Sequence, residues 1–373
     1  MKISGLSPIR EVVFMIINQI IKYFIAFGAL VGGIDRLIGN RFGLGERFEN
    51  GFRLLGSLGL SMAGIICMAP VLSSVLGIAV APLSRLTGID PGIFGSILSI
   101  DMGGYQLALD LARDPELGRF FAVIVTSSFG CTVVFSIPVG LGALDTDDHP
   151  LFIKGILLGF MAMPFSILAA GLVFGLSVTQ ILWNCLPILL LSLLLCVGIF
   201  LKPKAMSKGF QIVARVIRII GTVGLIAAAI RHICGIEILK GMPPLLEAME
   251  TICSIGITLL GSMPLAELFQ RVMKKPLAWI RQKTGLSPAS TTALLLSSVT
   301  VTATIAMIPE MDKRGKVVVS AFIVCGCSLF GSHIAFTMAA QPDMVTALLC
   351  SKLVGGFLAA VFALFATRAA KLA

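Results

Sequence analysis

Residues 89–112 read IDPGIFGSILSIDMGGYQLALDLA, an apolar segment with a carboxylate, Asp101, near its middle and the pair Gly103-Gly104 after it. An ionisable side chain inside a membrane segment is expensive, so it is treated as a functional residue by default. Two adjacent glycines allow a helix to end and the chain to turn back. Whether this segment crosses the bilayer or doubles back therefore decides the topology.

The composition is that of a helical membrane protein. Of the 373 residues, 57% are hydrophobic and 13% are charged, whereas a soluble domain has about 25% charged residues. The charge-free runs are each at least as long as the ~20 residues that span a bilayer, and they leave no room for a soluble domain. These runs are 54–84, 120–144, 155–201, 284–309 and, with His333 neutral, 317–342.

The net charge of +10 comes from Lys and Arg in short loops between apolar segments. This distribution follows the positive-inside rule and predicts contact with membrane lipid, not with nucleic acid. The nine cysteines all fall in apolar segments, where they are expected as small buried hydrophobes and not as metal ligands. No cleavage pattern for a signal peptide follows the N-terminus.

Eleven apolar segments repeat in order. At an offset of 197, Gly88 falls on Gly285 and Pro91 on Pro288, so the first five segments match the last five. This predicts repeats over 1–178 and 209–373, joined by a helix and basic loop over 179–208, as is usual in secondary transporters. The segments are 12–34, 54–78, 91–112, 118–142, 152–175, 179–201, 210–233, 245–268, 286–308, 317–340 and 344–367.

The positive charges distinguish two topologies. If all eleven segments crossed as transmembrane helices, the loops would hold 14 Lys and Arg on one face and 13 on the other. If 89–112 and 286–308 are re-entrant hairpins, nine segments cross and the numbers become 20 and 7. The second distribution has the expected bias. The fold class predicted is therefore an all-α polytopic membrane protein with about nine transmembrane helices and two re-entrant helical hairpins.

The hairpin topology inverts the second repeat relative to the first, because five crossings separate equivalent helices. The hairpin tips then approach the midplane from opposite faces, and such tips line substrate sites. The N-terminus lies outside and the C-terminus in the cytoplasm. Stretches 71–87 and 265–283, which precede the hairpins, are expected as interfacial amphipathic helices that support them.

On the first hairpin, the Asp101 carboxylate is suited to a primary ammonium in a low-dielectric cavity. The alternative is an ion pair with Lys22 or Lys352, the two lysines inside predicted spans. Tyr105 offers a ring face to a cation or is a packed aromatic with its hydroxyl on a backbone carbonyl. The substrate-binding residues predicted here are Asp101, Met102, Gly103, Gly104, Tyr105 and Gln106.

On the second repeat, hydroxyls near the predicted tip are candidates to bind a substrate alcohol. They are Ser297, Ser298 and Thr300, although most such hydroxyls are expected to bond to their own helix. Ser128 on the helix after the first hairpin is a further candidate. His333 is either a buried core residue or a proton relay, since the pKa of histidine is near neutral.

No catalytic motif is found, neither a Walker loop nor HExxH nor GxSxG. We therefore expect no enzyme, no cofactor and no metal. The alternative to a transporter is a non-transporting membrane scaffold or sensor that recruits a cytoplasmic partner through basic loops. The sequence leaves open whether the chain forms a homo-oligomer.

Five stretches of the chain carry a family resemblance. They are GIDRLIGNRFGLGERFENGF (33–52), LSIDMGGYQLALDLA (98–112), CTVVFSIPVGLG (131–142), MSKGFQIVARVI (206–217) and MDKRGKV (311–317). With them the chain resembles the ethanolamine utilisation permease (EutH) family over nearly its whole length. The resemblance implies a multi-pass protein of the bacterial inner membrane that imports ethanolamine for a lyase-based pathway, particularly when ethanolamine is scarce or the pH is low. The hairpin-then-helix layout is also similar to the gate domain of concentrative nucleoside transporters.

The chain departs from the family pattern at two places. An Asn-Asn-x-Pro run on the second hairpin is replaced by Thr-Val-Thr-Ala over 300–303, and Ser332 stands where an Asp often precedes the His. Asp101, the glycine pair and His333 carry over. The resemblance therefore implies a permease for ethanolamine or a closely related small amino alcohol, working by alternating access.

Overall fold

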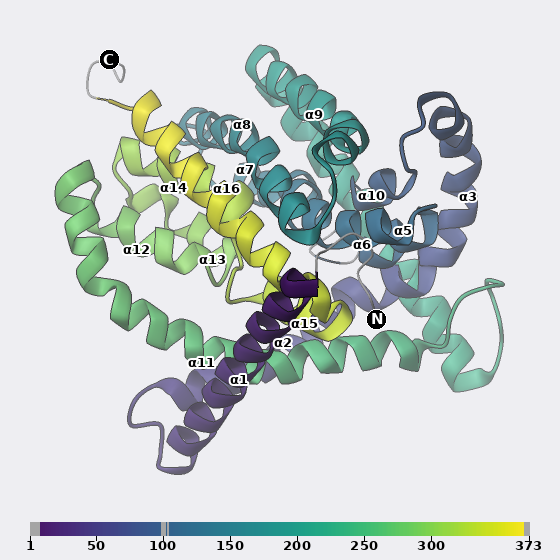
Figure 1. Ribbon diagram of the computed structural model, residues 1–373, viewed down its shortest axis with the longest axis horizontal. Coiled ribbons are helices and arrows are strands. Elements are labelled where there is room, and N and C mark those ends of the chain that lie inside the picture. The colour runs from purple at the N-terminus through teal and green to yellow at the C-terminus, as the bar shows by residue number, and fades with distance from the viewer. Residues whose placement is uncertain (1–7, 98–101, 103, 369–373) are drawn as a thin grey trace.

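The computed structural model describes residues 8–97, 102 and 104–368, and these residues form helices and no strands (Figure 1). Short pieces of π-helix (η1, η2, η3) and 3-10 helix (η4, η5) interrupt the α-helices. The elements are α1 (Pro8–Leu37), α2 (Leu44–Leu58), η1 (Gly59–Ala63), α3 (Gly64–Thr87), α4 (Gly92–Ile97), α5 (Tyr105–Leu111), α6 (Pro115–Phe120), η2 (Phe121–Gly130), η3 (Thr132–Ser136), α7 (Ile137–Ala143), α8 (His149–Phe174), α9 (Val178–Leu201), α10 (Pro203–Cys234), α11 (Leu245–Thr284), α12 (Pro288–Ser297), α13 (Val301–Ala306), η4 (Ile308–Glu310), α14 (Lys313–Gly326), α15 (Ser332–Ala340), η5 (Pro342–Met344) and α16 (Val345–Ala366).

Eight helices among the described residues are long and apolar enough to cross a membrane. They coincide with eight of the nine segments predicted to cross. The ninth, 317–340, is broken, because α14 ends at Gly326 and α15 begins at Ser332. The eight helices are Met15–Leu37, Leu44–Thr87, Pro115–Ala143, His149–Phe174, Val178–Gly198, Lys208–Cys234, Leu245–Thr284 and Pro342–Ala366.

The two stretches expected as interfacial amphipathic helices are helical and are not elements of their own. Residues 71–87 are the continuation of α3, and 265–283 are the continuation of α11. Each helix passes through its proline, Pro82 or Pro276, without ending. With 40 residues, α11 is about 60 Å long. Figure 1 shows it crossing the lower half of the molecule, above the end of α1 and α2, and curving upward toward α12.

The first predicted hairpin segment returns to its starting point. One carboxylate oxygen of Asp90 accepts hydrogen bonds from the backbone N–H groups of Arg113 and Asp114, both at 2.9 Å. The two short helices α4 and α5 pack so closely that a Cβ on Gly95 would lie 2.7 Å from the backbone of Ala108. A straight path through the bilayer would separate the two ends of this segment by about 30 Å.

The second hairpin segment is closed in a similar way, with the aspartate at its exit. The carboxylate of Asp312 accepts from the backbone N–H of Ser287 at 2.9 Å and from the hydroxyl of Ser290 at 2.6 Å. Its other oxygen caps α14 by accepting from the N–H of Gly315 at 3.0 Å. The chain thus doubles back between α12 and α13, as predicted.

Small residues allow α8, α14 and α16 to pack with little space between them. A Cβ on Gly155 would meet Ser320 of α14 at 2.4 Å, and a Cβ on Gly355 would meet Ser166 of α8 at 2.6 Å. Close approach at glycine is the usual way in which membrane helices associate. This three-helix unit is the rigid support for the broken helix α14–α15.

Candidate functional site

A cavity of about 600 Å³ lies where irregular backbone from three parts of the chain comes together. The turn between α12 and α13, the break between α14 and α15, and the π-helical stretch around Cys131 form much of its wall, and α2 with η1 and α11 contribute the rest. Non-helical backbone at membrane depth is tolerated where it lines such a cavity. The lining residues are Asn50, Arg53, Leu54, Ser57, Leu58, Ser61, Cys131, Phe135, Leu259, Met263, Val299, Thr300, Val301, Thr302, Ser328, Gly331 and Ser332.

The tip of the second hairpin is joined to the broken helix by backbone hydrogen bonds. The N–H of Ser328 donates to the carbonyl of Ser297 at 2.8 Å, and the N–H of Phe330 donates to the carbonyl of Ser298 at 2.7 Å. At Gly331 a Cβ would lie 2.0 Å from the carbonyl oxygen of Val299. Only glycine fits there, so the break and the hairpin tip form one unit.

The hydroxyls predicted on this hairpin divide into two groups. Ser297 and Ser298 donate to the carbonyls of Leu294 and Leu295 on their own helix, at 2.7 and 2.6 Å, which is the back-bonding expected of most of them. Thr300 lines the cavity. The serines therefore hold the tip through their backbone carbonyls, and Thr300 is the residue of the three that lines the cavity.

The first hairpin reaches the same broken helix from the other end of α15. Met102 is 1% exposed and belongs to the apolar cluster that contains Phe336 of α15. The Tyr105 ring meets Phe336 edge-on, with 5.1 Å between centroids, and its hydroxyl donates to Gln341 Oε1 at 2.8 Å. Tyr105 is thus a packed aromatic with a bonded hydroxyl, the structural alternative considered for it.

The remaining predicted residues are dispersed. Asp101 and Gly103 lie outside the described residues, and Gly104 precedes α5 as its N-cap. The Gln106 amide donates to Asp110 at 2.7 Å on an exposed face of α5, away from the cavity lining. Ser128 is buried and donates to the carbonyl of Ile124 at 2.6 Å.

His333 is fully buried in the first turn of α15, one residue after Ser332 of the cavity wall. Its backbone carbonyl accepts from the hydroxyl of Thr337 at 2.8 Å. The structure thus places His333 beside the lining but not among the described lining residues.

The sequence analysis missed the contribution of α2 and η1. Their polar residues Asn50, Arg53, Ser57 and Ser61 all line the cavity. The spacing of three or four residues places them on one face of a helix, and that periodicity is readable in the sequence. Arg53 is neutralised by Glu49, whose carboxylate is 2.8 Å away.

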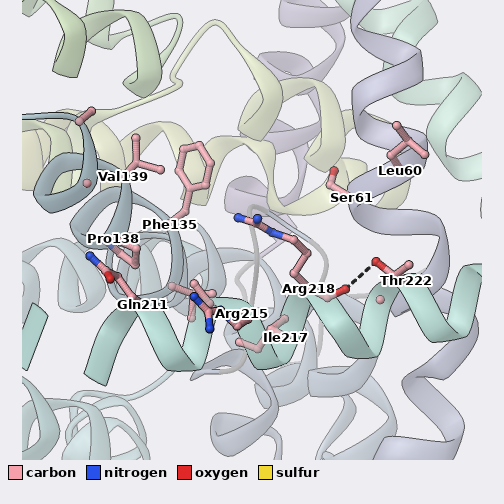
Figure 2. Close-up of a pocket in the computed structure, with 15 residues that line it drawn as sticks. Leu60, Ser61, Phe135, Pro138, Val139, Gln211, Arg215, Ile217, Arg218 and Thr222 are labelled. Carbon is pink, nitrogen blue, oxygen red and sulfur yellow. Dashed lines mark hydrogen bonds between the residues drawn. The ribbon is translucent and has the colours of Figure 1, made fainter. Parts of the chain in front are cut away.

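A second cavity of about 560 Å³ adjoins the first and shares Ser61 and Phe135 with it. Figure 2 shows Arg218 extending from α10 toward the space between these two residues. Arg215, one turn earlier, also lines this cavity. No aspartate or glutamate is among the described residues that line either cavity. Nor do the described residues contain a cluster of three or more His, Cys, Asp or Glu arranged to hold a metal ion.

The carboxylate that closes the second hairpin lies outside the long apolar helices. Burial by itself raises the pKa of Asp312, but hydrogen bonds from Ser290, Ser287 and Gly315 outweigh it and leave this pKa below its ordinary value of 3.8. The group is therefore ionised at neutral pH and holds the hairpin closed as an acceptor.

The sequence profile of one family matches residues 17–366, nearly the whole chain, and its description is "Ethanolamine utilisation protein, EutH". This chain belongs to the EutH family. The match includes both hairpins and every element that lines the two cavities. The resemblance seen in the sequence is thereby confirmed.

Individual relatives agree with the family assignment. A protein of Listeria monocytogenes serotype 1/2a (strain 10403S) named "Probable ethanolamine permease EutH" is 37% identical over 94% of each chain. A protein of the same name from Salmonella typhimurium is 32% identical over 91% of this chain and 93% of its own. A Bacillus subtilis member, "Uncharacterized protein YxeR", is 36% identical over 95% and 96%. No solved structure matches this EutH-family chain.

Proposed function

We propose that this EutH-family protein is a permease that moves ethanolamine, or a closely related small amino alcohol, across the membrane by alternating access. The observation that carries the proposal is the cavity at the tip of the second hairpin, where unwound backbone lines an interior space. Discontinuous helices around a central cavity are the usual substrate sites of secondary transporters. The names of the relatives supply the substrate class.

The proposed topology has nine crossings, one of them the broken helix α14–α15, and two hairpins in inverted halves. Contacts between loops support it, because each joins loops that this topology places on one face. On the proposed outer face Arg119 pairs with Asp343 at 2.6 Å. On the proposed cytoplasmic face Lys316 pairs with Asp148.

In this topology the two cavities open toward the cytoplasm, so the conformation is inward-facing. Arg53 and Arg215 mark that side, since both follow cytoplasmic loops in the predicted arrangement. The outer side is closed by the Arg119–Asp343 pair and by the bond from Tyr105 to Gln341. Transport requires these outer contacts to open while the cytoplasmic cavity closes.

For substrate recognition we propose that the Asp101 carboxylate binds the ammonium group of the substrate. Hydroxyls of the second hairpin, above all that of Thr300, would bind its alcohol group. Asp101 lies outside the described residues, and its assignment rests on the sequence. No carboxylate is among the described lining residues of either cavity, and we propose that the first hairpin supplies the counter-charge. The membrane potential drives a monovalent cation inward with roughly 2.3 kcal/mol per 100 mV, so a uniporter suffices.

The test is uptake of labelled ethanolamine into proteoliposomes that contain the purified protein. We expect uptake by the wild type and a large loss in Asp101→Asn. The matched control is Asp110→Asn, which removes a carboxylate from the same hairpin on its exposed face and is expected to transport normally. Absence of uptake by folded wild-type protein would reject the permease and favour the scaffold or sensor.

A further inference from the structure

Among the described residues, one lysine or arginine side chain is buried, that of Lys352. The proposed substrate site does not use it. Lys352 lies in the first half of α16 and is 1% exposed. Burying a charged group costs free energy unless the group is hydrogen-bonded or paired. Charged residues inside membrane segments are therefore rare and usually have a function. No ion pair joins it to a carboxylate within the described residues.

The ammonium of Lys352 is bound to backbone of the π-helical stretch η2. Its Nζ donates to the carbonyl oxygen of Ser127 in η2 at 2.7 Å and lies 4.0 Å from Cys327 Sγ. The backbone here departs from the α-helical pattern, because the N–H of Cys131 donates to the carbonyls of Thr126 and Ser128 and not to that of Ser127. The Ser127 carbonyl is therefore an acceptor for the ammonium at the irregular end of η2.

This contact lies directly behind the cavity. Ser127 is four residues before Cys131, and Cys327 is adjacent to Ser328, and both of those neighbours line the cavity. Cys131 and Ser328 are also equivalent under the 197-residue offset between the repeats. The lysine therefore bridges the two irregular helices, one from each repeat, that form the cavity wall.

We propose that the Lys352 ammonium occupies the position that a coupling cation takes in an ion-driven transporter. In secondary transporters, unwound backbone carbonyls beside the substrate site coordinate Na⁺ or a proton carrier. A tethered ammonium satisfies the same carbonyl and cannot leave with the substrate. Transport by this protein consequently needs no free coupling cation. This inference rests on the proposed permease function and assigns its driving force.

Three measurements on the proteoliposome system test the inference. Wild-type ethanolamine uptake is expected to be unchanged when Na⁺ is replaced by N-methylglucamine. Lys352→Met, which keeps an unbranched side chain that is one atom shorter and uncharged, is expected to lose uptake about tenfold or more, the factor carried by one charge-assisted hydrogen bond. Its ethanolamine-induced thermal shift is expected to persist, because the ammonium lies behind the lining and not in it.

The third measurement is chemical rescue. Lys352→Ala removes the last three carbons and the nitrogen of the side chain, and n-propylammonium has those same atoms. We expect n-propylammonium to restore uptake in Lys352→Ala, and n-propanol, the neutral analogue, to have no effect. Wild-type uptake in the same amine concentrations controls for competition at the substrate site.

Several results would overturn the inference. They are full uptake by Lys352→Met, Na⁺-dependent uptake by the wild type, and no rescue of a folded Lys352→Ala protein. Restoration of uptake in Asp101→Asn combined with Lys352→Met would show instead that the lysine is a counter-ion for that carboxylate. Wild-type protein without any uptake would reject the permease itself, so the two failures are distinguishable.

Discussion

Gly331→Ala is predicted to separate the second hairpin from the broken helix. A Cβ at this position would lie 2.0 Å from the carbonyl oxygen of Val299, whereas ordinary contacts begin at 3.4 Å. The two must therefore move apart by about 1.4 Å, the difference between these distances. The backbone bonds from Ser328 and Phe330 to the hairpin tip, 2.8 and 2.7 Å long, would not survive a displacement of that size.

The magnitude follows from these losses. Two backbone hydrogen bonds contribute about 1 kcal/mol each, and overpacking adds about 1–3 kcal/mol. The docked tip is thus destabilised by about 3–5 kcal/mol. We expect ethanolamine uptake to fall by more than about tenfold, and the thermal midpoint to drop.

Gly142→Ala is the matched control, because Gly142 lines the neighbouring cavity and a Cβ there meets nothing within 4 Å. As a helix residue it should gain about 0.5–1 kcal/mol of stability, with uptake unchanged. If Gly331→Ala transported ethanolamine as well as Gly142→Ala does, the inference that hairpin and break act as one unit would be refuted.

Three further predictions concern the hairpin ends and the cavity wall. Because the pKa of Asp312 is below its ordinary value of 3.8, its stabilising effect is present above the unfolded pKa and is lost as the pH falls through the lower folded pKa. Between about pH 5 and pH 2, a range around the ordinary Asp pKa, the thermal midpoint should therefore fall more in the wild type than in Asp312→Asn. An equal fall in both proteins would contradict this. Cys131 lines the cavity, so a small thiol reagent added from the cytoplasmic side should inhibit uptake, with protection by ethanolamine and resistance in Cys131→Ser; equal inhibition of that variant would place the reactive thiol elsewhere. Cysteines introduced at Pro91 and Asp114 should be labelled from the same face of the membrane, and labelling from opposite faces would rule out the first hairpin.

Much of the fold was predictable because the bilayer makes length and hydrophobicity decisive. Eight predicted spans are long apolar helices in the structure. The glycine-containing segment 89–112 and the hydroxyl-rich segment 286–308 both double back. The basic loops follow from local composition, and so does the return of the first hairpin segment to Asp90. By contrast, proline usually kinks or ends a helix, yet α11 continues through Pro276, and no local pattern reveals this.

The candidate site shows the same division. The sequence identified the segments that carry it, including Thr300 and the region of His333. It did not identify Arg53 or Ser61, because this face of α2 and η1 becomes part of the wall only where it meets the hairpin tip. Nor did it separate Ser297 from Thr300, since back-bonding is decided by local rotamers.

The sequence by itself determined a helical membrane protein with two hairpins, because hydrophobic runs, glycine breaks and loop charges are local properties that the bilayer reads directly. Only the tertiary structure decided that 317–340 is interrupted, that its break is joined to the second hairpin, and that Lys352 binds the Ser127 carbonyl. These features depend on which unpaired backbone groups come within hydrogen-bonding distance across the fold, and that distance is set by packing between segments far apart in the chain.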